Sequence, residues 1–183
     1  MIMKERKPKM KNNLKKLFAL LLSLCLLCSV ALAEDPELNW SDVSDENKAL
    51  GELMQLSLPD MPGIIFWVPS VMAAADVSSL GDTAPAAAFL TEDNAYSLSV
   101  YTLEVSSLED YLTEQVNNGT EISNITINGI TAVACENSNL NFEGIIIKMT
   151  DTTLLYFACT PKDGDDTWDD VKGIIFSSIQ VAQ

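Results

Sequence analysis

The chain has 183 residues, 48% of them hydrophobic, with 11 Lys and Arg against 26 Asp and Glu and no His. Its net charge of −15 is unevenly divided: residues 1–33 hold seven basic side chains and one acidic one (+6), whereas residues 34–183 hold four basic and 25 acidic ones (−21). The lack of His excludes His-based triads, His general bases and His metal ligands. A strongly acidic chain without Arg beyond residue 33 repels phosphates, which argues against nucleic acid as a partner.

The N-terminal segment has the three parts of a secretory signal peptide. A basic stretch precedes an apolar run at 17–30, and Ala31-Leu32-Ala33 supplies small residues before Glu34. This pattern predicts cleavage between Ala33 and Glu34 and a secreted or cell-envelope location, with membrane contact only through the export signal. An uncleaved anchor is the alternative, since residues 17–33 just reach the ~17–25 residues that span a bilayer.

Removal of the signal leaves residues 34–183, which is the size of one domain. Residues 34–62 are predicted to form an acidic lead-in and an N-terminal helix, which packs on a sandwich domain at 63–183. The helix is expected because apolar side chains recur near the helical period, and Ser41 can cap its start. This apolar stripe consists of Trp40, Val43, Leu50, Leu53 and Met54. Pro59 and Pro62-Gly63 end the helix.

The next part of the chain is predicted to contain strands and turns. Residues 64–68 form a short β-type run, and the Ser, Gly, Asp and Pro residues of 69–85 indicate a loop with a helical turn at 72–75. A hairpin follows, with one apolar face in its second arm. Its arms are 86–91 and 96–105, joined by Glu92-Asp93-Asn94.

Two helices are predicted in the second half of the chain. Ser107 is the N-cap of the first, with Asp110 three residues on, and Asn118-Gly119 ends it. The second begins near Asp166 and carries an apolar stripe. That stripe consists of Trp168, Val171, Ile175 and Ile179.

A strand meander lies between these helices. Asn128-Gly129, the strongest short hairpin signal, joins its first two strands. Both faces of the meander carry apolar side chains, so we expect helices to cover both. The predicted fold is α+β: an α/β/α sandwich with a mainly antiparallel, twisted sheet. The expected strands are 122–127, 130–136, 142–149 and 153–160.

The predicted register determines whether Cys135 and Cys159, the two cysteines beyond residue 33, can form a disulfide. Turns centred near 138–140 and on 151–152 pair Gly144 with both Cys135 and Cys159. The thiols then share a face but lie two strands, about 9.6 Å, apart, which exceeds the limit of about 7 Å for a disulfide. We therefore expect Cys135 and Cys159 to be unpaired thiols in the core.

The acidic segment 163–170 is the candidate cation site. Asp163, Asp165 and Asp169 can ligate calcium, because carboxylates at alternating loop positions suit a hard cation. The segment lacks EF-hand spacing, however, and the same carboxylates also stabilise a helix N-terminus. We expect no metal and no cofactor, with a weak calcium site as the alternative.

Trp67 is the candidate for a ligand groove. It stands beside Pro69 at a strand end, whereas Trp40 and Trp168 lie on helical stripes and are expected in the core. Serine-hydrolase elbows and glycine-rich phosphate loops are missing from the sequence. A glycosidase needs one carboxyl group with a raised pKa, and we find no acidic residue in an obvious apolar pocket segment.

The segment 107–179 resembles the PsbP/DcrB-like α/β/α sandwiches, and most closely uncharacterised secreted proteins of gut Firmicutes. The resemblance implies a PsbP-like fold and a non-catalytic accessory or binding role. It transfers no site residues, because the shared motifs are a helix cap, a hairpin and a packed helix. Those motifs are Ser107–Tyr111, Ile127–Ala132 and Ile174–Ile179.

We therefore expect an exported, non-catalytic binding or accessory domain whose partner is a protein or an envelope component. The alternatives are a small carboxylate-dependent enzyme that acts on glycans, and a calcium-stabilised surface module. A folded pocket that combines two acidic residues with an aromatic wall favours the enzyme. An acidic surface with an apolar patch beside Trp67 favours the binding domain.

Overall fold

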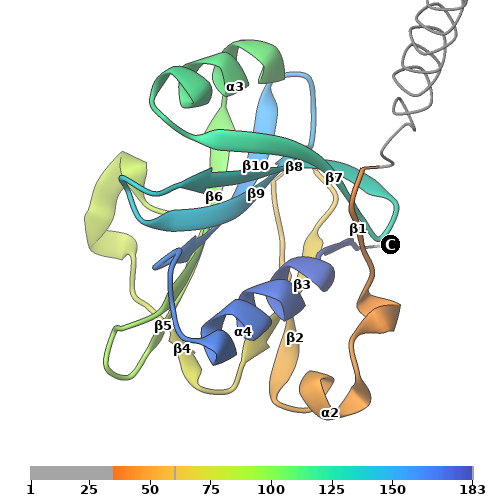
Figure 1. Ribbon diagram of the computed structural model, residues 1–183. Helices are drawn as coiled ribbons and strands as arrows, with labels where there is room; N and C mark the ends of the chain where they lie inside the picture. Colours follow the sequence, from red (N-terminus) through yellow and green to blue (C-terminus); the bar gives the residue numbers. More distant parts are fainter. Residues whose placement is uncertain (1–34, 60, 183) are drawn as a thin grey trace, which may run out of the picture. The chain divides into compact units, whose positions relative to one another are not determined.

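The computed structural model describes residues 35–59 and 61–182. The predicted export segment, with its cleavage site at Ala33–Glu34, lies outside these residues. The described part is a mixed α+β fold around an eight-stranded sheet, in which the β1–β7 pair is parallel and the other pairs are antiparallel (Figure 1). Within these residues, no helix is long and apolar enough to cross a membrane.

The large sheet has the order β1-β7-β8-β9-β10-β6-β5-β4, and a second sheet has the order β11-β3-β2. The strands are β1 (Glu37–Leu38), β2 (Gly51–Leu56), β3 (Ile64–Pro69), β4 (Met72–Ala74), β5 (Ala87–Thr91), β6 (Ser97–Glu104), β7 (Glu121–Ile127), β8 (Ile130–Asn137), β9 (Phe142–Lys148), β10 (Thr153–Thr160) and β11 (Gln180–Val181). The helices are α2 (Asp45–Lys48), α3 (Leu108–Asn117) and α4 (Asp166–Ser177), with 3-10 helices η1 (Trp40–Asp42) and η2 (Ser78–Thr83).

Strands β7 to β10 form the predicted meander. The Asn128-Gly129 turn has positive φ angles of 48° and 78°, which is the geometry of a two-residue hairpin. Cys135 pairs with Gly144, as predicted. Gly144 then pairs with Ala158 and not with Cys159, so the predicted β9–β10 register is wrong by one residue.

The turn between β9 and β10 explains this shift. The Thr153 carbonyl accepts hydrogen bonds from the N–H groups of Met149 (3.0 Å) and Thr150 (3.1 Å), and Thr150 Oγ1 accepts one from the N–H of Thr153 (2.9 Å). The turn is thus centred on Asp151 and not between Asp151 and Thr152. A register slip of one residue moves every side chain of the strand to the other face of the sheet. All side chains of β10 therefore lie on the face opposite to the predicted one.

Both faces of the central strands are buried. On one face, a small core cluster forms, against which α3 packs with Leu108, Tyr111 and Leu112. This cluster consists of Val133, Cys135, Ile146 and Leu154. The other face belongs to a larger cluster, which includes Ile145, Leu155, Phe157 and Cys159 together with Trp168, Ile174, Ile175 and Phe176 of α4. Val116, near the C-terminal end of α3, is 49% exposed.

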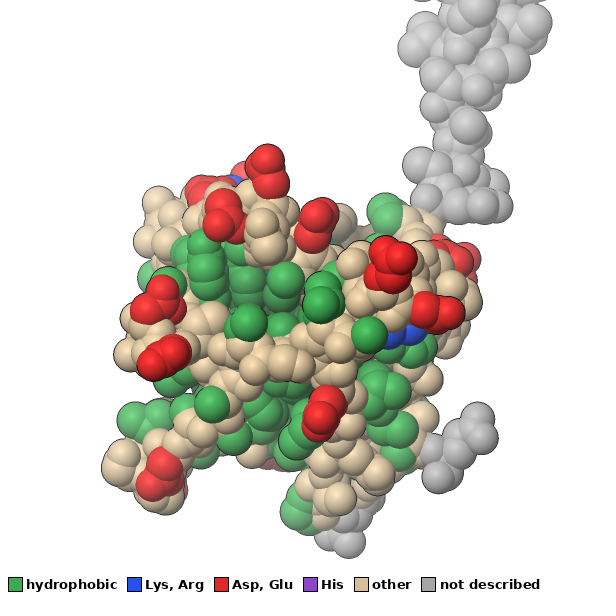
Figure 2. All heavy atoms as spheres, turned by 90° about the horizontal axis from the view of Figure 1, so that it is seen from below, with side chains coloured by type: hydrophobic (Ala, Val, Ile, Leu, Met, Phe, Trp, Pro, Cys, Tyr) green, Lys and Arg blue, Asp and Glu red, His purple; other side chains and the backbone are tan. Residues whose placement is uncertain are grey.

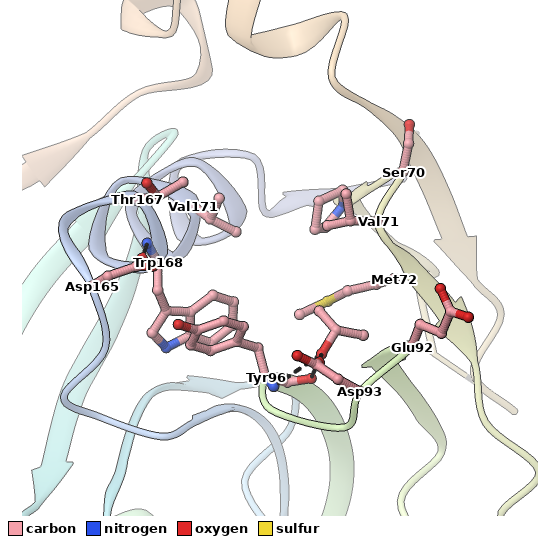
Figure 3. Close-up of a pocket in the computed structure, with 12 residues that line it drawn as sticks. Ser70, Val71, Met72, Glu92, Asp93, Tyr96, Asp165, Thr167, Trp168 and Val171 are labelled. Carbon is pink, nitrogen blue, oxygen red and sulfur yellow. Dashed lines mark hydrogen bonds between the residues drawn. The ribbon is translucent and has the colours of Figure 1, made fainter.

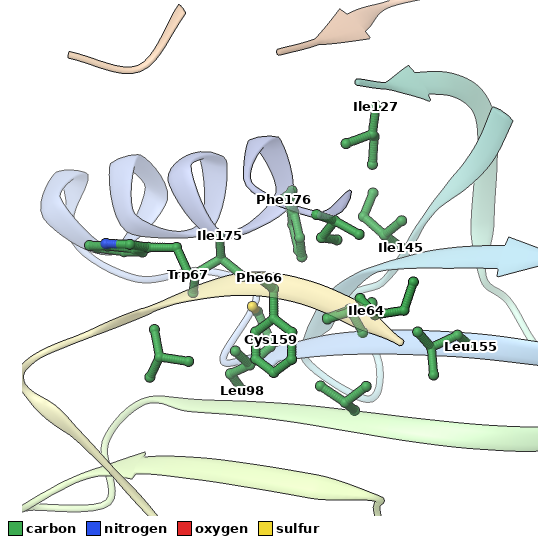
Figure 4. Packing of buried hydrophobic residues seen from close by; sticks show 14 of the residues in the cluster. Ile64, Phe66, Trp67, Leu98, Ile127, Ile145, Leu155, Cys159, Ile175 and Phe176 are labelled. Atoms are coloured by element: carbon green, nitrogen blue, oxygen red, sulfur yellow. The ribbon is translucent and has the colours of Figure 1, made fainter. Parts of the chain in front are cut away.

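A second sheet contributes to the core on the α4 side (Figure 4). Phe66 of β3 packs edge to face on Phe157 and Phe89 of the large sheet, with ring centroids 5.3 and 5.9 Å apart. Strand β3 also contacts α4. The sequence predicted a single sheet between helical layers, whereas here a strand as well as a helix covers this face.

The predicted helix over residues 40–54 is wrong. The segment forms η1, then the single turn α2 capped by Ser44, and then β2. Strand β2 pairs with β3 along its whole length, because the backbone groups of a buried strand need hydrogen-bond partners. The apolar period did not reflect burial, as Leu53 on β2 is 50% exposed.

The predicted helical turn at 72–75 is a strand instead. Met72–Ala74 forms β4, which pairs antiparallel with β5 and is the outermost strand at that end of the large sheet. Pairing satisfies backbone groups of β5 that would otherwise lie at an open edge. The β5–β6 hairpin agrees with the prediction.

Asn128 connects three distant segments. Its Nδ2 donates hydrogen bonds to the carbonyls of Ser177 (2.8 Å) and Ile179 (2.9 Å), and its Oδ1 accepts one from the N–H of Trp40 (2.8 Å). The last carbonyls of a helix lack intrahelical partners. The hairpin turn thus satisfies the C-terminal end of α4.

Gly144→Ala tests the observed β9–β10 packing. A Cβ at this position collides with the carbonyl oxygen of Phe157 and the ring of Tyr156, so we expect a loss of about 1–3 kcal/mol in the free energy of unfolding. Gly173→Ala in α4 is the control, because a Cβ there meets nothing within 4 Å, and we expect a change between zero and about 1 kcal/mol of stabilisation. Urea unfolding measures both variants, and equal midpoints would contradict the packing described.

Candidate functional site

The predicted groove residue Trp67 lies in the core. It is 1% exposed, its Nε1 donates a hydrogen bond to the carbonyl of Lys48 (3.1 Å), and its backbone N–H donates one to Ser178 Oγ (2.7 Å). The neighbouring strands β2 and β11 cover both edges of β3. Trp67 therefore lines no groove, despite its position beside Pro69.

The three carboxylates of the calcium hypothesis have separate partners. These are Lys162 for Asp163 (3.4 Å), the N–H of Trp168 for Asp165 (2.9 Å) and Lys172 for Asp169 (3.0 Å). Asp165 is the N-cap of α4. Among residues 35–59 and 61–182, no three His, Cys, Asp or Glu side chains are grouped to hold a metal ion.

Cys135 and Cys159 are free thiols, and both are buried. They lie in different core clusters on opposite faces of the sheet, not on one face as predicted, because β10 is shifted by one residue. Burial raises the pKa of Cys135 to about 12, although a hydrogen bond with Tyr156 opposes the shift. Burial also raises the pKa of Cys159. Both groups are thus protonated, weakly reactive thiols at neutral pH.

A cleft of about 850 Å³ lies between the start of α4 and the segment that contains β4 (Figure 3). Thr167, Trp168 and Val171 line it on the α4 side, and Val71 and Met72 lie across from them. The volume is within the range of ~300–1,000 Å³ that is typical of ligand sites. The other lining residues are Pro69, Ser70, Thr91, Glu92, Asp93, Tyr96 and Asp165.

A stacked aromatic pair forms part of the cleft wall. The rings of Tyr96 and Trp168 lie 4.7 Å apart with an interplanar angle of 29°. Trp168 Nε1 donates a hydrogen bond to the carbonyl of Pro161 (2.7 Å), and Trp168 is only 3% exposed. The indole is therefore a fixed, almost wholly buried part of the wall, and the half-buried Tyr96 ring offers a ligand more of the exposed aromatic surface.

Three carboxylates, Glu92, Asp93 and Asp165, border the cleft. Hydrogen bonds from Thr91 Oγ1 (2.7 Å) and the N–H of Ala95 (3.0 Å) to Asp93 Oδ1 hold the pKa of Asp93 below its usual value, so this carboxyl stays ionised. Among the described lining residues, none is Lys or Arg. Figure 2 shows the same imbalance over a whole face, where acidic side chains lie around hydrophobic ones and few basic side chains are visible.

Lys172 fixes α4, and with it one wall of the cleft. The residue is 4% exposed, and its Nζ lies 2.7 Å from Glu143 Oε2 on β9 and 3.0 Å from Asp169 Oδ1. It also donates a hydrogen bond to the carbonyl of Lys162. Burial alone lowers the pKa of this amine, but Glu143 and Asp169 outweigh burial and raise it. Lys172 is therefore charged and holds α4 against the sheet.

Sequence reasoning did not find this cleft. It placed Trp168 in the core, where the structure also has it, but did not place it at a cleft, and it treated Glu92-Asp93-Asn94 only as a turn. The sequence held only a weak signal, since the predicted loop at 69–85 carries several apolar residues, among them Val71, which is 71% exposed in the structure. The lining segments come together through β4–β5 pairing and the packing of α4, which local patterns do not encode.

No protein-family model matches the chain, and no curated protein is similar to it in sequence. Among solved structures, the chain is similar to the solution structure of cyanobacterial PsbP (CyanoP) from Synechocystis sp. PCC 6803, with 16% identity and a TM-score of 0.44. The match covers 70% of this chain and 92% of CyanoP. A likeness this distant shows neither the family nor the function of the chain. The resemblance to secreted proteins of gut Firmicutes stays a prediction.

Lys172→Met is expected to lower the free energy of unfolding by roughly 1–3 kcal/mol. This is less than the ~3–5 kcal/mol typical of broken buried pairs, because the Glu143 and Asp169 side chains are 38% and 61% exposed. Lys148→Met is the control, since its pair with the exposed Asp151 contributes less than about 1 kcal/mol. Thermal unfolding compares the variants, and equal losses would show that Lys172 does not hold α4.

The buried thiol of Cys135 predicts a loss of stability in alkali. Its pKa is 9.0 when unperturbed and about 12 in the fold, so its stabilising contribution is fully present below pH 9 and is lost as the pH rises toward 12. Urea unfolding between these pH values should show a smaller decline for Cys135→Ser than for the unmodified chain. A thiol reagent at pH 8 should label the native protein far more slowly than the unfolded one, and equal labelling rates would contradict the burial of both thiols.

Proposed function

We propose that this chain is an exported, non-catalytic binding domain whose ligand occupies the cleft between α4 and β4. The observation that carries the proposal is the cleft itself, which has apolar walls on packed elements and a border of carboxylates. Such sites combine apolar surface with a few polar groups that orient the ligand. The export signal predicted at 1–33 supports a secreted or cell-envelope location, where the partner is a protein or an envelope component.

The side chains of the cleft support binding over catalysis. The chain has no His to act as a general base. Asp93 has a lowered pKa, which is opposite to what a general acid in glycoside hydrolysis needs. Asp165 is engaged as the N-cap of α4, where its Oδ1 accepts a hydrogen bond from Trp168.

A carboxylate-dependent enzyme acting on glycans is the second candidate. It is favoured by one observation, since the cleft combines acidic residues with an aromatic wall, as the sequence analysis required for this function. The rings of Tyr96 and Trp168 stack on each other, however, and Trp168 leaves little of its face open for a sugar. The calcium-stabilised module has less support, because its three carboxylates have separate partners.

Capture experiments with a cleft variant test the proposed function. The chain is produced with its own export segment, recovered in processed form and used to capture binders from the envelope of the producing organism. Val71→Gln removes an exposed apolar side chain from the cleft, and Leu140→Gln is its control, because Leu140 is 67% exposed and does not line the cleft. Removing this apolar contact should lower capture of a cleft ligand severalfold.

Binders that are reduced by Val71→Gln and retained by Leu140→Gln support the cleft as the binding site. Binders that are retained by both variants, or lost equally from both, contradict it. If the protein hydrolyses a glycan in a screen and Glu92→Gln abolishes this activity, the enzyme hypothesis replaces the binding-domain hypothesis.

A further inference from the structure

We infer that the cleft binds an extended peptide segment in which one residue separates a Lys or Arg from an apolar residue. This inference rests on the proposed function and names the ligand class of the same site. It follows from the charge at the cleft, the apolar surface across it and the sheet edge beside it.

The acidic border of the cleft has no cation within the described residues to neutralise it. Each of the four lysines beyond residue 33 is paired with a carboxylate that does not line the cleft. These pairs are Lys48 with Asp45, Lys148 with Asp151, Lys162 with Glu136 and Lys172 with Glu143. Glu92 and Asp93 are thus complementary to a positive charge that the ligand must supply.

The N-terminus of α4 does not reverse this preference. A helix N-terminus carries roughly half a positive charge, which disfavours a cation. Asp165 and Asp166 stand at this end of α4, and Asp93 lies across the cleft and stays ionised. The carboxylates therefore outweigh the helix dipole.

The apolar part of the ligand is indicated by the two walls of the cleft. Val71 and Met72 lie across an open space from Trp168 and Val171 (Figure 3). Val71 is 71% exposed, so an apolar ligand side chain that enters between the walls removes the Val71 side chain from water. A simple cation without an apolar group leaves this surface exposed.

A sheet edge favours a peptide over a free amine or a glycan. Met72 lies both in the cleft and on β4, which ends the strand order of the large sheet. The outer edge of such a strand presents unpaired N–H and C=O groups, to which an extended chain can add its backbone. Side chains of an added strand alternate between its two faces, so a cationic and an apolar side chain reach the same face only when one residue separates them. A short peptide with lysine and valine at alternate odd-numbered positions, and serine between them, presents both groups on the same face.

Titration of the processed protein with three end-blocked hexapeptides tests the inference. The probe is Lys-Ser-Val-Ser-Lys-Ser, in which lysine and valine share one face of an extended chain; one control replaces lysine by glutamine, and the other replaces valine by serine. Because opposite charges and apolar burial both contribute, the lysine–valine peptide should bind about tenfold more tightly than either control. Raising the salt concentration from about 50 to about 500 mM should lower the affinity for the lysine–valine peptide, since salt screens the attraction between exposed charges.

Variants assign the binding to the cleft. Glu92→Gln should lower the affinity for the lysine–valine peptide severalfold. The control Glu52→Gln, which removes an exposed carboxylate on β2 outside the cleft, should leave the affinity unchanged. Val71→Gln should also weaken it, and Leu140→Gln should not. Equal effects of Glu92→Gln and Glu52→Gln would overturn the assignment.

The outcomes separate this inference from the proposed function. If the glutamine–valine and lysine–valine peptides bind equally and both depend on Val71, the cation requirement is wrong and cleft binding stands. If no peptide binds while envelope capture still depends on Val71, the peptide class is wrong and the binding domain stands. If neither peptide binding nor capture depends on Val71, both proposals are wrong.

Discussion

The structure depends on one constraint: strands β8, β9 and β10 bury apolar side chains on both faces. Neither face can therefore meet water without losing the stabilisation that burial provides. Helix α3 packs against the cluster on one side, and α4 with β3 packs against the other. Strands β2 and β11 in turn satisfy the edges of β3. Most of the fold outside the meander is a consequence of covering these three strands.

Positive charge is scarce in this chain, and its placement determines the surface. Lys162 and Lys172 contact Glu136 and Glu143, which are opposite each other on β8 and β9. Like charges directly opposite destabilise a strand pair, so these two lysines offset that repulsion. They also tie the loop before α4 (Lys162) and the middle of α4 (Lys172) to the sheet. The lysines serve the fold, and the carboxylates at the cleft have no lysine partner among the described residues. Because the few lysines stabilise the sheet and α4, the acidic cleft is left complementary to an external cation.

Elements with strong local signals could be predicted. Ser107 caps α3 through the N–H of Asp110, and the four strands of the meander were placed within one or two residues. Prediction was wrong where the signal was an apolar period alone, because residues 40–54 form a turn and a strand whose Leu53 is half exposed. Trp67, the predicted groove residue, is enclosed by β2 and β11, whereas Trp168 is buried in the core as predicted and also forms part of the cleft wall. Burial of a large side chain depends on distant segments, which no local pattern records.

The sequence by itself determined the basic character of residues 1–33, the acidic character of residues 34–183, the lack of His, the helix caps and the Asn128-Gly129 hairpin. Each of these depends on composition or on residues within one turn. Only the tertiary structure decided the register of β10, the faces on which Cys135 and Cys159 lie and the existence of the cleft. A shift of one residue in a turn reverses a whole strand, and strand pairing and helix packing bring the cleft residues together from three parts of the chain. These features are cooperative and non-local, so they arise only when the entire domain is folded.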